Sequence, residues 1–207
     1  MSFIPATRRK AFRGSSVIFQ DLFTDSNGTN LTAHTPDIDT AGNGWVDQVG
    51  SMEIQSNEAA ADGNERITTV DVENADVEIS CDVITPSSGS RGLAMYFRWV
   101  NSSDYWRLFV TPLGASASQN ALLLQKFGGT GYQQYNPDAP GVVIDNSQTY
   151  TIRINLNGDD ITVYLDDVEE ISATNSQFNT ATIHGIYAER NPAGGGGTLD
   201  NYSITAL

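Results

Sequence analysis

The chain has 207 residues, of which 39% are hydrophobic and 17% charged, and its net charge is −14. This composition provides enough apolar material for the core of one sizeable domain and excludes a wholly disordered chain. No apolar run reaches the roughly 18 residues of a membrane-spanning helix, and no apolar region follows the basic start, so we expect a protein that is not secreted. The single cysteine, Cys81, excludes an internal disulfide framework, and two histidines, His34 and His184, leave little material for metal or triad chemistry.

The charge is unevenly distributed along the chain. Four of the 11 basic residues, Arg8, Arg9, Lys10 and Arg13, precede the first acidic residue, Asp21. Residues 1–16 therefore carry +4, and subtraction from −14 leaves −18 on residues 17–207. An acidic body repels phosphate backbones, so we expect the main domain not to bind nucleic acid. We interpret residues 1–16 as an extended basic arm and residues 17–207 as one domain.

From Val17 onward, short runs of alternating apolar and polar residues are separated by turn residues. This alternation predicts β-strands, and no apolar pattern of helical period extends over a dozen residues. The expected strands are 17–23, 77–84, 93–100, 105–111, 121–127, 150–156, 161–165, 168–171, 183–188 and 199–205, with weaker candidates at 45–49, 52–55 and 67–72. Asn157–Gly158 and Asp166–Asp167 mark tight hairpin turns because these residue types tolerate positive φ. So many short strands predict an antiparallel β-sandwich or barrel.

Two neighbouring predicted strands are rich in aromatic and cationic residues. Successive side chains of a strand point to opposite faces. In the first strand this alternation predicts one face with Leu93, Met95, Phe97 and Trp99 and another with Tyr96 and Arg98. In the second strand it predicts one face with Tyr105, Arg107 and Phe109 and another with Trp106, Leu108 and Val110.

Three parts of the chain combine turns and aromatic residues in a recognisable order. They are Phe19-Gln-Asp-Leu-Phe23 with Asp25-Ser-Asn-Gly28, then Gly92-Leu-Ala-Met-Tyr-Phe-Arg-Trp99 with Asp104-Tyr-Trp-Arg-Leu108, and finally His184-Gly-Ile-Tyr187 with Asp200-Asn-Tyr-Ser-Ile204. Over roughly residues 17–207, this pattern resembles the concanavalin A-like lectin/glucanase family, whose domain is also called the laminin-G-like jelly roll. The resemblance implies an all-β fold, an antiparallel β-sandwich with jelly-roll topology, preceded by the N-terminal arm.

That family includes lectins, glycosidases, adhesion modules and virion proteins, so fold alone does not decide the function. The basic arm, the missing secretion signal and the single sandwich are similar to bacteriophage structural proteins of this class. The resemblance therefore implies a non-enzymatic virion protein without a cofactor, a capsid decoration (cement) or minor head protein made in the bacterial host cytoplasm. Its partners would be the major capsid protein or other virion proteins, with further copies of itself on the particle. The arm residues expected to make the contact are Phe3, Ile4, Arg8, Arg9, Lys10, Phe12 and Arg13.

The alternative is a carbohydrate-binding adhesin module of a phage head fibre or tail that contacts a cell-surface glycan. In that case Tyr96, Arg98, Tyr105 and Arg107 line a sugar-binding groove, where rings stack on pyranose faces and arginine donates to hydroxyls. The competing interpretation of the same residues pairs Arg98 and Arg107 across strands with Glu78 or Asp82.

A glycosidase is the least favoured of the three functions. Asp76, Glu78 and Asp82 share one face of a predicted strand, and alternate residues lie about 6.8 Å apart, a spacing compatible with a pair of catalytic carboxylates. Glycosidases of this fold class commonly carry an E-x-D-x-x-E pattern, which this strand lacks. The same alternation also describes a strand with one solvated face, so we expect no catalytic residue here.

A metal site is not expected, although some jelly-roll proteins hold a structural calcium near their first and last strands. The positions at which such an ion would be sought are Asp21, Asp25 and Asp200. Asp25-Ser-Asn27-Gly28 lacks the ligand spacing of a calcium loop and fits an Asx-turn better.

Overall fold

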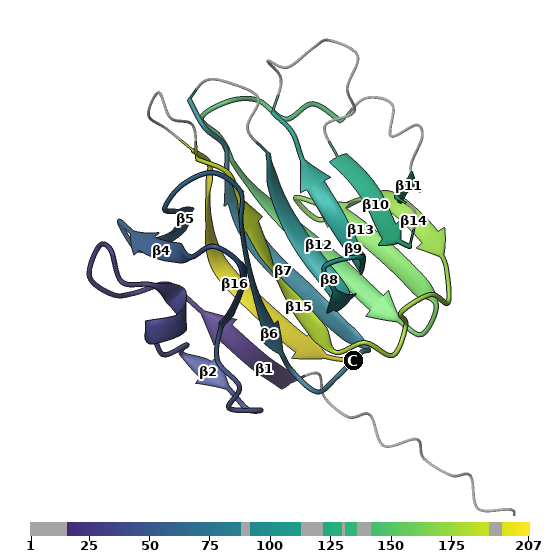
Figure 1. The fold of residues 1–207 in the computed structure, drawn as a ribbon. Helices are drawn as coiled ribbons and strands as arrows, with labels where there is room; N and C mark the ends of the chain where they lie inside the picture. The colour runs from purple at the N-terminus through teal and green to yellow at the C-terminus, as the bar shows by residue number, and fades with distance from the viewer. Residues whose placement is uncertain (1–15, 88–91, 113–121, 130, 136–141, 191–195) are drawn as a thin grey trace, which may run out of the picture.

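Two antiparallel sheets make up the computed structural model, which describes residues 16–87, 92–112, 122–129, 131–135, 142–190 and 196–207. The first is a nine-stranded sheet with the order β14-β13-β12-β7-β16-β1-β2, to which β5 adds on β16 and β4 on β5 (Figure 1). Its strands are β1 (Ser16–Asp21), β2 (Ile38–Asp39), β4 (Met52–Gln55), β5 (Glu58–Ala61), β7 (Val77–Ile84), β12 (Thr149–Asn157), β13 (Asp160–Leu165), β14 (Val168–Thr174) and β16 (Thr198–Ala206).

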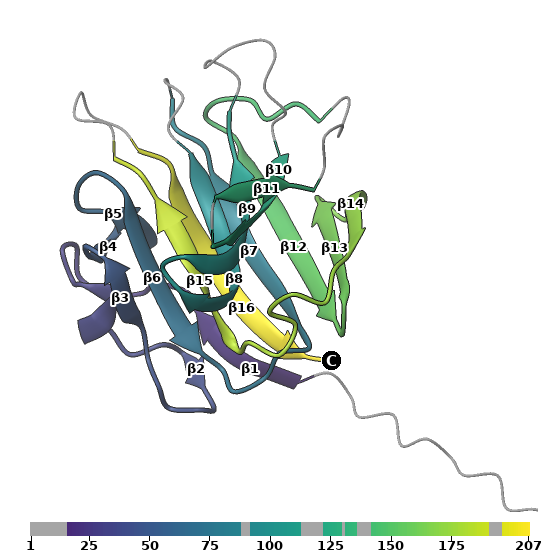
Figure 2. The ribbon, with the colours of Figure 1, turned by 45° about the vertical axis from the view of Figure 1, so that its right-hand side comes forward.

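The second sheet has seven strands in the order β11-β10-β9-β8-β15-β6-β3, all of which are labelled in Figure 2. They are β3 (Val46–Val49), β6 (Arg66–Asp71), β8 (Leu93–Asn101), β9 (Asp104–Val110), β10 (Leu122–Gly128), β11 (Tyr132–Gln134) and β15 (Ile183–Ala188). A 3-10 turn, η1 (Leu31–Ala33), precedes β2. Among the described residues, no helix has the length and hydrophobicity to cross a membrane.

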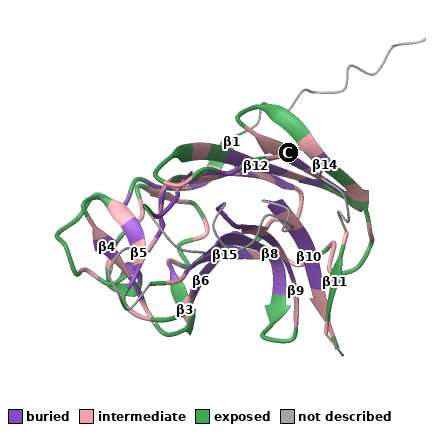
Figure 3. Cartoon of the chain, turned by 90° about the horizontal axis from the view of Figure 1, so that it is seen from above, coloured by how far each residue is buried: buried purple, intermediate pink, exposed green. Residues whose placement is uncertain are grey.

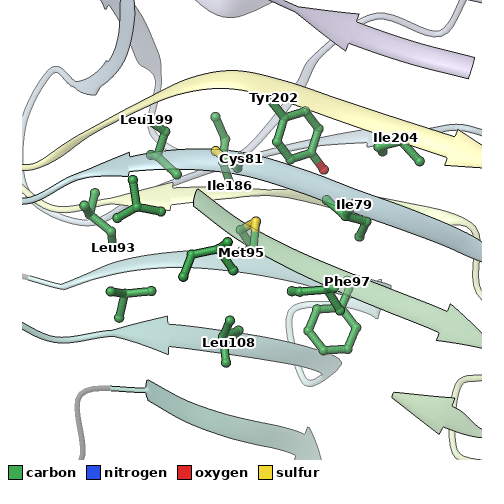
Figure 4. Packing of buried hydrophobic residues seen from close by; sticks show 14 of the residues in the cluster. Ile79, Cys81, Leu93, Met95, Phe97, Leu108, Ile186, Leu199, Tyr202 and Ile204 are labelled. Atoms are coloured by element: carbon green, nitrogen blue, oxygen red, sulfur yellow. The ribbon is translucent and has the colours of Figure 1, made fainter. Parts of the chain in front are cut away.

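The main core lies between the two sheets. It is filled by the apolar residues of alternating strands, for example Ile79 and Cys81 of β7 against Met95 and Phe97 of β8 (Figure 4). The expectation that Cys81 is a small buried hydrophobic residue is confirmed, and its burial raises the pKa of the thiol well above the usual value. A thiol of this kind is unreactive because the nucleophilic form is the thiolate.

The turn chemistry fixes several strand connections. Leu165 pairs with Val168, so the turn between β13 and β14 is Asp166–Asp167, and both residues have the positive φ that this pair was expected to tolerate (47° and 66°). The hairpin between β12 and β13 turns at Gly158–Asp159, one residue later than predicted, because Asn157 is still paired with Asp160. Three short strands, β2, β5 and β11, were not predicted.

The two sheets differ in shape, and the ends of the described chain belong to one of them. Seen from above, the seven-stranded sheet is curved, with its hollow side facing away from the nine-stranded sheet (Figure 3). The edge region of the nine-stranded sheet brings the ends of the described chain together, since β1 pairs with β16 and Ser16 lies opposite Ala206.

Candidate functional site

The hollow side of the seven-stranded sheet carries a second apolar cluster, separate from the main core. Ile67, Ala94, Tyr96, Trp99 and Tyr187 are its buried members, and the half-buried Tyr105, Phe109 and Ile183 pack against them. We call the ring-bearing surface of this side the aromatic face; it comprises Tyr96, Trp99, Tyr105, Phe109, Phe127, Tyr132 and Tyr187, together with Arg107 and Gln125.

Three rings of the aromatic face are stacked in a row. Trp99 and Tyr105 lie 4.9 Å apart between ring centroids with an 11° angle between planes, and Tyr105 and Phe127 lie 5.3 Å apart, again at 11°. The strand register explains the row, because Phe127 of β10 pairs with Tyr105 of β9. Rings stacked in this way turn their faces toward one another, so the row forms an apolar ridge made mainly of ring edges, against which the apolar part of a sugar can pack.

Trp99 reaches this face because β8 contains a bulge, and here the structure corrects the prediction. Arg98 has a φ of 50°, and the pairing of β8 with β9 and β15 shifts register around it. A bulge shifts the alternation by one residue. Trp99, predicted on the same side as Phe97, therefore contacts Tyr96, with ring centroids 5.6 Å apart.

Arg98 was predicted to lie on the same face as Tyr96, but the structure directs it to the opposite side of the sheet. It is fully buried, and its Nη2 donates to the backbone oxygen of Gly158 at 2.5 Å. Burial lowers the pKa of its guanidinium, and the nearby carboxylates of Asp76 and Asp159 partly oppose this effect. Its backbone amide donates to Nδ1 of the buried His184, whose Nε2 faces the carbonyl oxygen of Asn74. Arg98 is therefore part of the interior.

Of the predicted ligand-binding residues, the structure brings together Tyr96, Tyr105 and Arg107. Arg107 is opposite Tyr96 in β8 and Gln125 in β10, and it donates to both: Nη1 to the Tyr96 hydroxyl at 3.3 Å and Nε to Gln125 Oε1 at 2.8 Å. Tyr96 is only 2% exposed, so its ring supports the site from beneath. Burial raises the pKa of Tyr96 to about 12, which keeps its hydroxyl protonated at neutral pH.

The accessible part of the aromatic face lies over β9, β10 and β11. Tyr105, Arg107, Phe109 and Phe127 are half-buried, and Tyr132 is 62% exposed. Sequence reasoning missed Trp99, Phe109, Phe127, Tyr132, Tyr187 and Gln125 as parts of this site. The alternation of Leu123, Gln125 and Phe127 along β10 was a usable signal for two of them, whereas the position of Trp99 depends on the bulge.

The acidic strand β7 lies on the other sheet, away from the aromatic face. Glu78 forms an ion pair with Arg153 of β12 (3.1 Å), and Asp82 accepts hydrogen bonds from Thr151 and Asn201. The suggested pairing of Arg98 or Arg107 with Glu78 or Asp82 is therefore wrong. Asp76 accepts a hydrogen bond from the backbone amide of Gly158. These contacts are those of a solvated, internally paired sheet surface.

Asp21 and Asp25 are joined by a histidine. His34 places Nε2 3.0 Å from Asp21 Oδ1 and Nδ1 3.2 Å from Asp25 Oδ2. Asp21 is fully buried and also accepts hydrogen bonds from Trp45 Nε1 and the amide of Phe23; burial raises its pKa, and these hydrogen bonds and His34 partly offset the rise. Asp25 also accepts from the amide of Ser26, as an Asx-type loop closure does.

The third carboxylate named as a possible calcium ligand, Asp200, accepts hydrogen bonds from the amide and side chain of Asn201. No group of three or more histidine, cysteine or acidic residues in the described part of the chain is arranged to hold a metal ion. The predicted partner-binding residues of the arm, from Phe3 to Arg13, lie outside the described residues.

The sequence matches no protein-family model and none of the curated proteins compared with it. Solved structures share its fold. The carbohydrate-binding module CBM66 from Bacillus subtilis superposes with a TM-score of 0.57 at 16% identity, covering 78% of this chain and 95% of the module. The CBM2 module of the evolved Dit of Lactobacillus casei BL23 phage J-1 gives a TM-score of 0.55 at 13% identity, with 92% and 95% covered.

The Bacillus licheniformis beta-glucanase also superposes, with a TM-score of 0.55 at 11% identity and with 94% of this chain and 98% of the enzyme covered. Together with the two-sheet architecture, these similarities identify the fold as the concanavalin A-like jelly roll, as the sequence resemblance implied. At such low identities they establish the fold, and the function has to be argued from the site.

Proposed function

We propose that this chain is a carbohydrate-binding module whose ligand lies on the aromatic face. The observation that carries the proposal is the row of stacked rings, Trp99, Tyr105 and Phe127, beside the hydrogen-bonding group of Arg107 and Gln125. Rings supply apolar contact to sugar faces, and a few fixed polar groups provide orientation, which is the usual composition of a small-molecule site. The two carbohydrate-binding modules of the same fold support this assignment.

The proposed module acts without catalysis. Glu78, the best candidate for a catalytic carboxylate on β7, is ion paired with Arg153 and belongs to the sheet opposite the aromatic face. A glycoside hydrolase usually places two carboxylates on either side of the scissile bond, the acid of the pair having a raised pKa. Asp76 and Glu78 therefore fit a structural role in the nine-stranded sheet.

A glycan array tests the proposal. The wild-type chain is expected to bind a defined subset of printed glycans, and Tyr105→Ala and Phe127→Ala are expected to lower that binding at least tenfold by removing rings from the stacked row. Tyr164→Ala is the matched control, because its ring contacts Arg153 on the nine-stranded sheet. Binding of no glycan, or equal losses in all three variants at unchanged stability, would contradict the assignment.

We further propose that the module is a component of a bacteriophage particle, as a capsid decoration or minor head protein or as an adhesin of a head fibre or tail. The similarity to a module of a phage Dit supports this context. On this proposal the protein is made in the host cytoplasm and assembles with the major capsid protein or other virion proteins, in several copies. The cations Arg8, Arg9, Lys10 and Arg13, with their apolar neighbours, make the contact.

Reconstitution tests this second proposal. Full-length protein in which the four arm cations are replaced by alanine is incubated with particles that lack this component. We expect lower occupancy than with the wild type, and the largest deficit at low ionic strength, because salt screens attraction between exposed charges. Wild-type occupancy by this variant at every ionic strength would show that the four cations do not make the attachment.

A further inference from the structure

The two sheets carry very different charges. In the described strands of the nine-stranded sheet, Arg153 is the only cation, and it is already paired with Glu78 at 3.1 Å and Asp167 at 3.5 Å. The strands of the seven-stranded sheet contain four cations, Arg66, Arg98, Arg107 and Lys126. The strands of the nine-stranded sheet are therefore more acidic than those of the sheet that carries the aromatic face.

Three of these four cations are committed elsewhere. Arg66 forms an ion pair with Asp62. Arg98 is turned into the interior by the bulge, and Lys126 is buried, donates to Gln177 and lies over the ring of Tyr135. Arg107 alone lies among the rings of the aromatic face.

Arg107 has neutral neighbours. Within the described residues, no carboxylate comes within ion-pair distance of its guanidinium; its acceptors are the amide oxygen of Gln125 and the hydroxyl of Tyr96. Its Cζ also lies 5.1 Å from the ring centroid of Phe109 and 6.0 Å from that of Tyr132. These contacts hold the side chain in place and, in the part of the chain that the structure describes, leave its charge without a carboxylate partner. A guanidinium has five N–H donors, and the two named hydrogen bonds use two of them.

Several carboxylates lie around the rim of this face. Burial and, secondarily, the charges of Glu189 and Glu65 raise the pKa of Tyr187, so these two carboxylates lie near that ring. Three others have local donors. Asp47 accepts hydrogen bonds from Ser51 and Thr68, Asp71 accepts from Thr182, and Asp104 accepts from Asn101. Each is at or near the end of its strand, or on the edge strand β3. Among the described residues, Arg107 is therefore the one charged side chain that lies among the rings.

A net charge of −14 works against an anionic ligand, so the two effects have to be weighed. Packed sheets lie about 10 Å apart, and the Debye length is about 8 Å at physiological salt, so the carboxylates on the far side of the nine-stranded sheet are largely screened from the aromatic face. A direct guanidinium–carboxylate contact beside aromatic rings is screened much less and is charge-assisted. The local contact is therefore the stronger of the two effects.

Resting on the carbohydrate-binding function proposed above, we propose that the aromatic face selects acidic glycans. The ligand is a sugar that bears a carboxylate, such as a uronic or sialic acid, with the carboxylate on Arg107 and the sugar ring against Tyr105 or Phe127. Arginine matches this group because its planar fork pairs with the two carboxylate oxygens. One cation suits one carboxylate, whereas a phosphate backbone or a highly sulfated chain is bound by a series of cations.

Matched pairs of ligands test this selectivity. Arrays carry uronic-acid and sialic-acid glycans beside the same glycans as methyl esters, which keep the hydroxyls and lose the charge. The wild type is expected to bind the acids at least tenfold more tightly than the esters. Arg107→Gln removes the charge and is expected to lose this preference, so that it binds each acid and its ester equally, whatever its overall affinity. Arg153→Gln, on the other sheet, is the control and is expected to retain the preference.

The outcomes separate this inference from the function on which it rests. Equal or tighter binding of the esters by the wild type overturns acid selectivity and leaves carbohydrate binding intact. Binding of no acid, ester or neutral glycan overturns both. The comparison of acid with ester needs no variant, so it stays decisive even where Arg107→Gln lowers stability.

Discussion

Arg98 and Trp99 are consecutive residues that lie on opposite faces of the seven-stranded sheet. Arg98 has a φ of 50° and is buried on the side of His184 and Gly158, while Trp99 stacks on Tyr105. Without the bulge, the guanidinium would occupy the aromatic face and the indole would point into the sandwich. One backbone torsion thus determines which of the two side chains lies on the candidate ligand face.

A pair of variants tests the bulge. In a regular strand, glycine is less stable than alanine by about 0.5–1 kcal/mol, but at a positive φ alanine carries a steric cost of about 1–2 kcal/mol. We therefore expect the free energy of unfolding, measured by denaturant titration, to be about 1 kcal/mol higher for Arg98→Gly than for Arg98→Ala. The same pair at Arg153, in the regular strand β12, is the control and is expected to show the reverse order. The same order at both positions would contradict the bulge.

The buried histidine predicts a dependence of stability on pH. Burial, and secondarily the charge of Arg98, lower the pKa of His184 to about 4, despite its contact with the carbonyl oxygen of Asn74. Its pKa in the unfolded chain is about 6.5, so between these values the unfolded state binds more protons. The free energy of unfolding therefore falls as the pH is lowered from 6.5 toward 4, by up to about 3 kcal/mol from this residue.

Denaturant titrations of the wild type and His184→Gln at several pH values isolate this contribution, since the carboxylates are common to both proteins. The stability difference between the two is expected to shrink on acidification. Parallel curves over the whole range would show that the pKa of His184 is the same in the folded and unfolded chains, so that burial does not lower it.

Gly185 is expected to tolerate no side chain. A Cβ at this position would lie 2.8 Å from the Cα of Thr69 and even closer to the backbone oxygen of Thr68, both on the paired strand β6. Because backbone cannot move aside without breaking the sheet, we expect Gly185→Ala to cost about 3 kcal/mol of unfolding free energy. Gly158→Ala is the control: it has a positive φ of 57° but nothing within 4 Å, so only the backbone cost of about 1–2 kcal/mol applies. Equal losses at the two sites would argue against the close approach of β15 and β6.

Glu78 is expected to be dispensable for both stability and chemistry. Its ion pair with Arg153 is half-exposed, and such pairs contribute at most about 1 kcal/mol. We expect the wild type to release no reducing sugar from β-glucans and Glu78→Gln to unfold within about 1 kcal/mol of the wild type. Release of sugar by the wild type that disappears in the variant would establish a hydrolase and contradict the non-catalytic function.

The sequence allowed the sandwich to be predicted because most of its strands are amphipathic. Alternation placed β7, β9, β12 and β13 on the correct faces, and Asp166–Asp167 marked its turn. Strand β8 is different: seven consecutive residues, from Leu93 to Trp99, are buried, because both faces of the strand are covered. Alternation carries little information in such a strand. The bulge also has no local signal, since arginine does not favour a positive φ and its partners, Gly158 and His184, come from distant parts of the chain.

The candidate site was accordingly predicted in part. Tyr105 and Arg107 are in a strand whose alternation is regular, and both lie where it placed them. Phe127 and Gln125 come from β10, which the sequence marked as a strand but gave no reason to place beside β9. That neighbourhood follows from the sheet order, which depends on long-range pairing.

The pairing of Ser16 with Ala206 has a consequence for how the domain would be displayed. Both ends of the described chain belong to the nine-stranded sheet, and the aromatic face belongs to the other (Figures 1 and 2). A protein or surface attached at either end of the described chain would therefore lie on the side of the nine-stranded sheet. The stacked rings would then point away from it. Immobilisation through either terminus is expected to keep the ligand face open, whereas coupling through surface groups around β9 and β10 would block it.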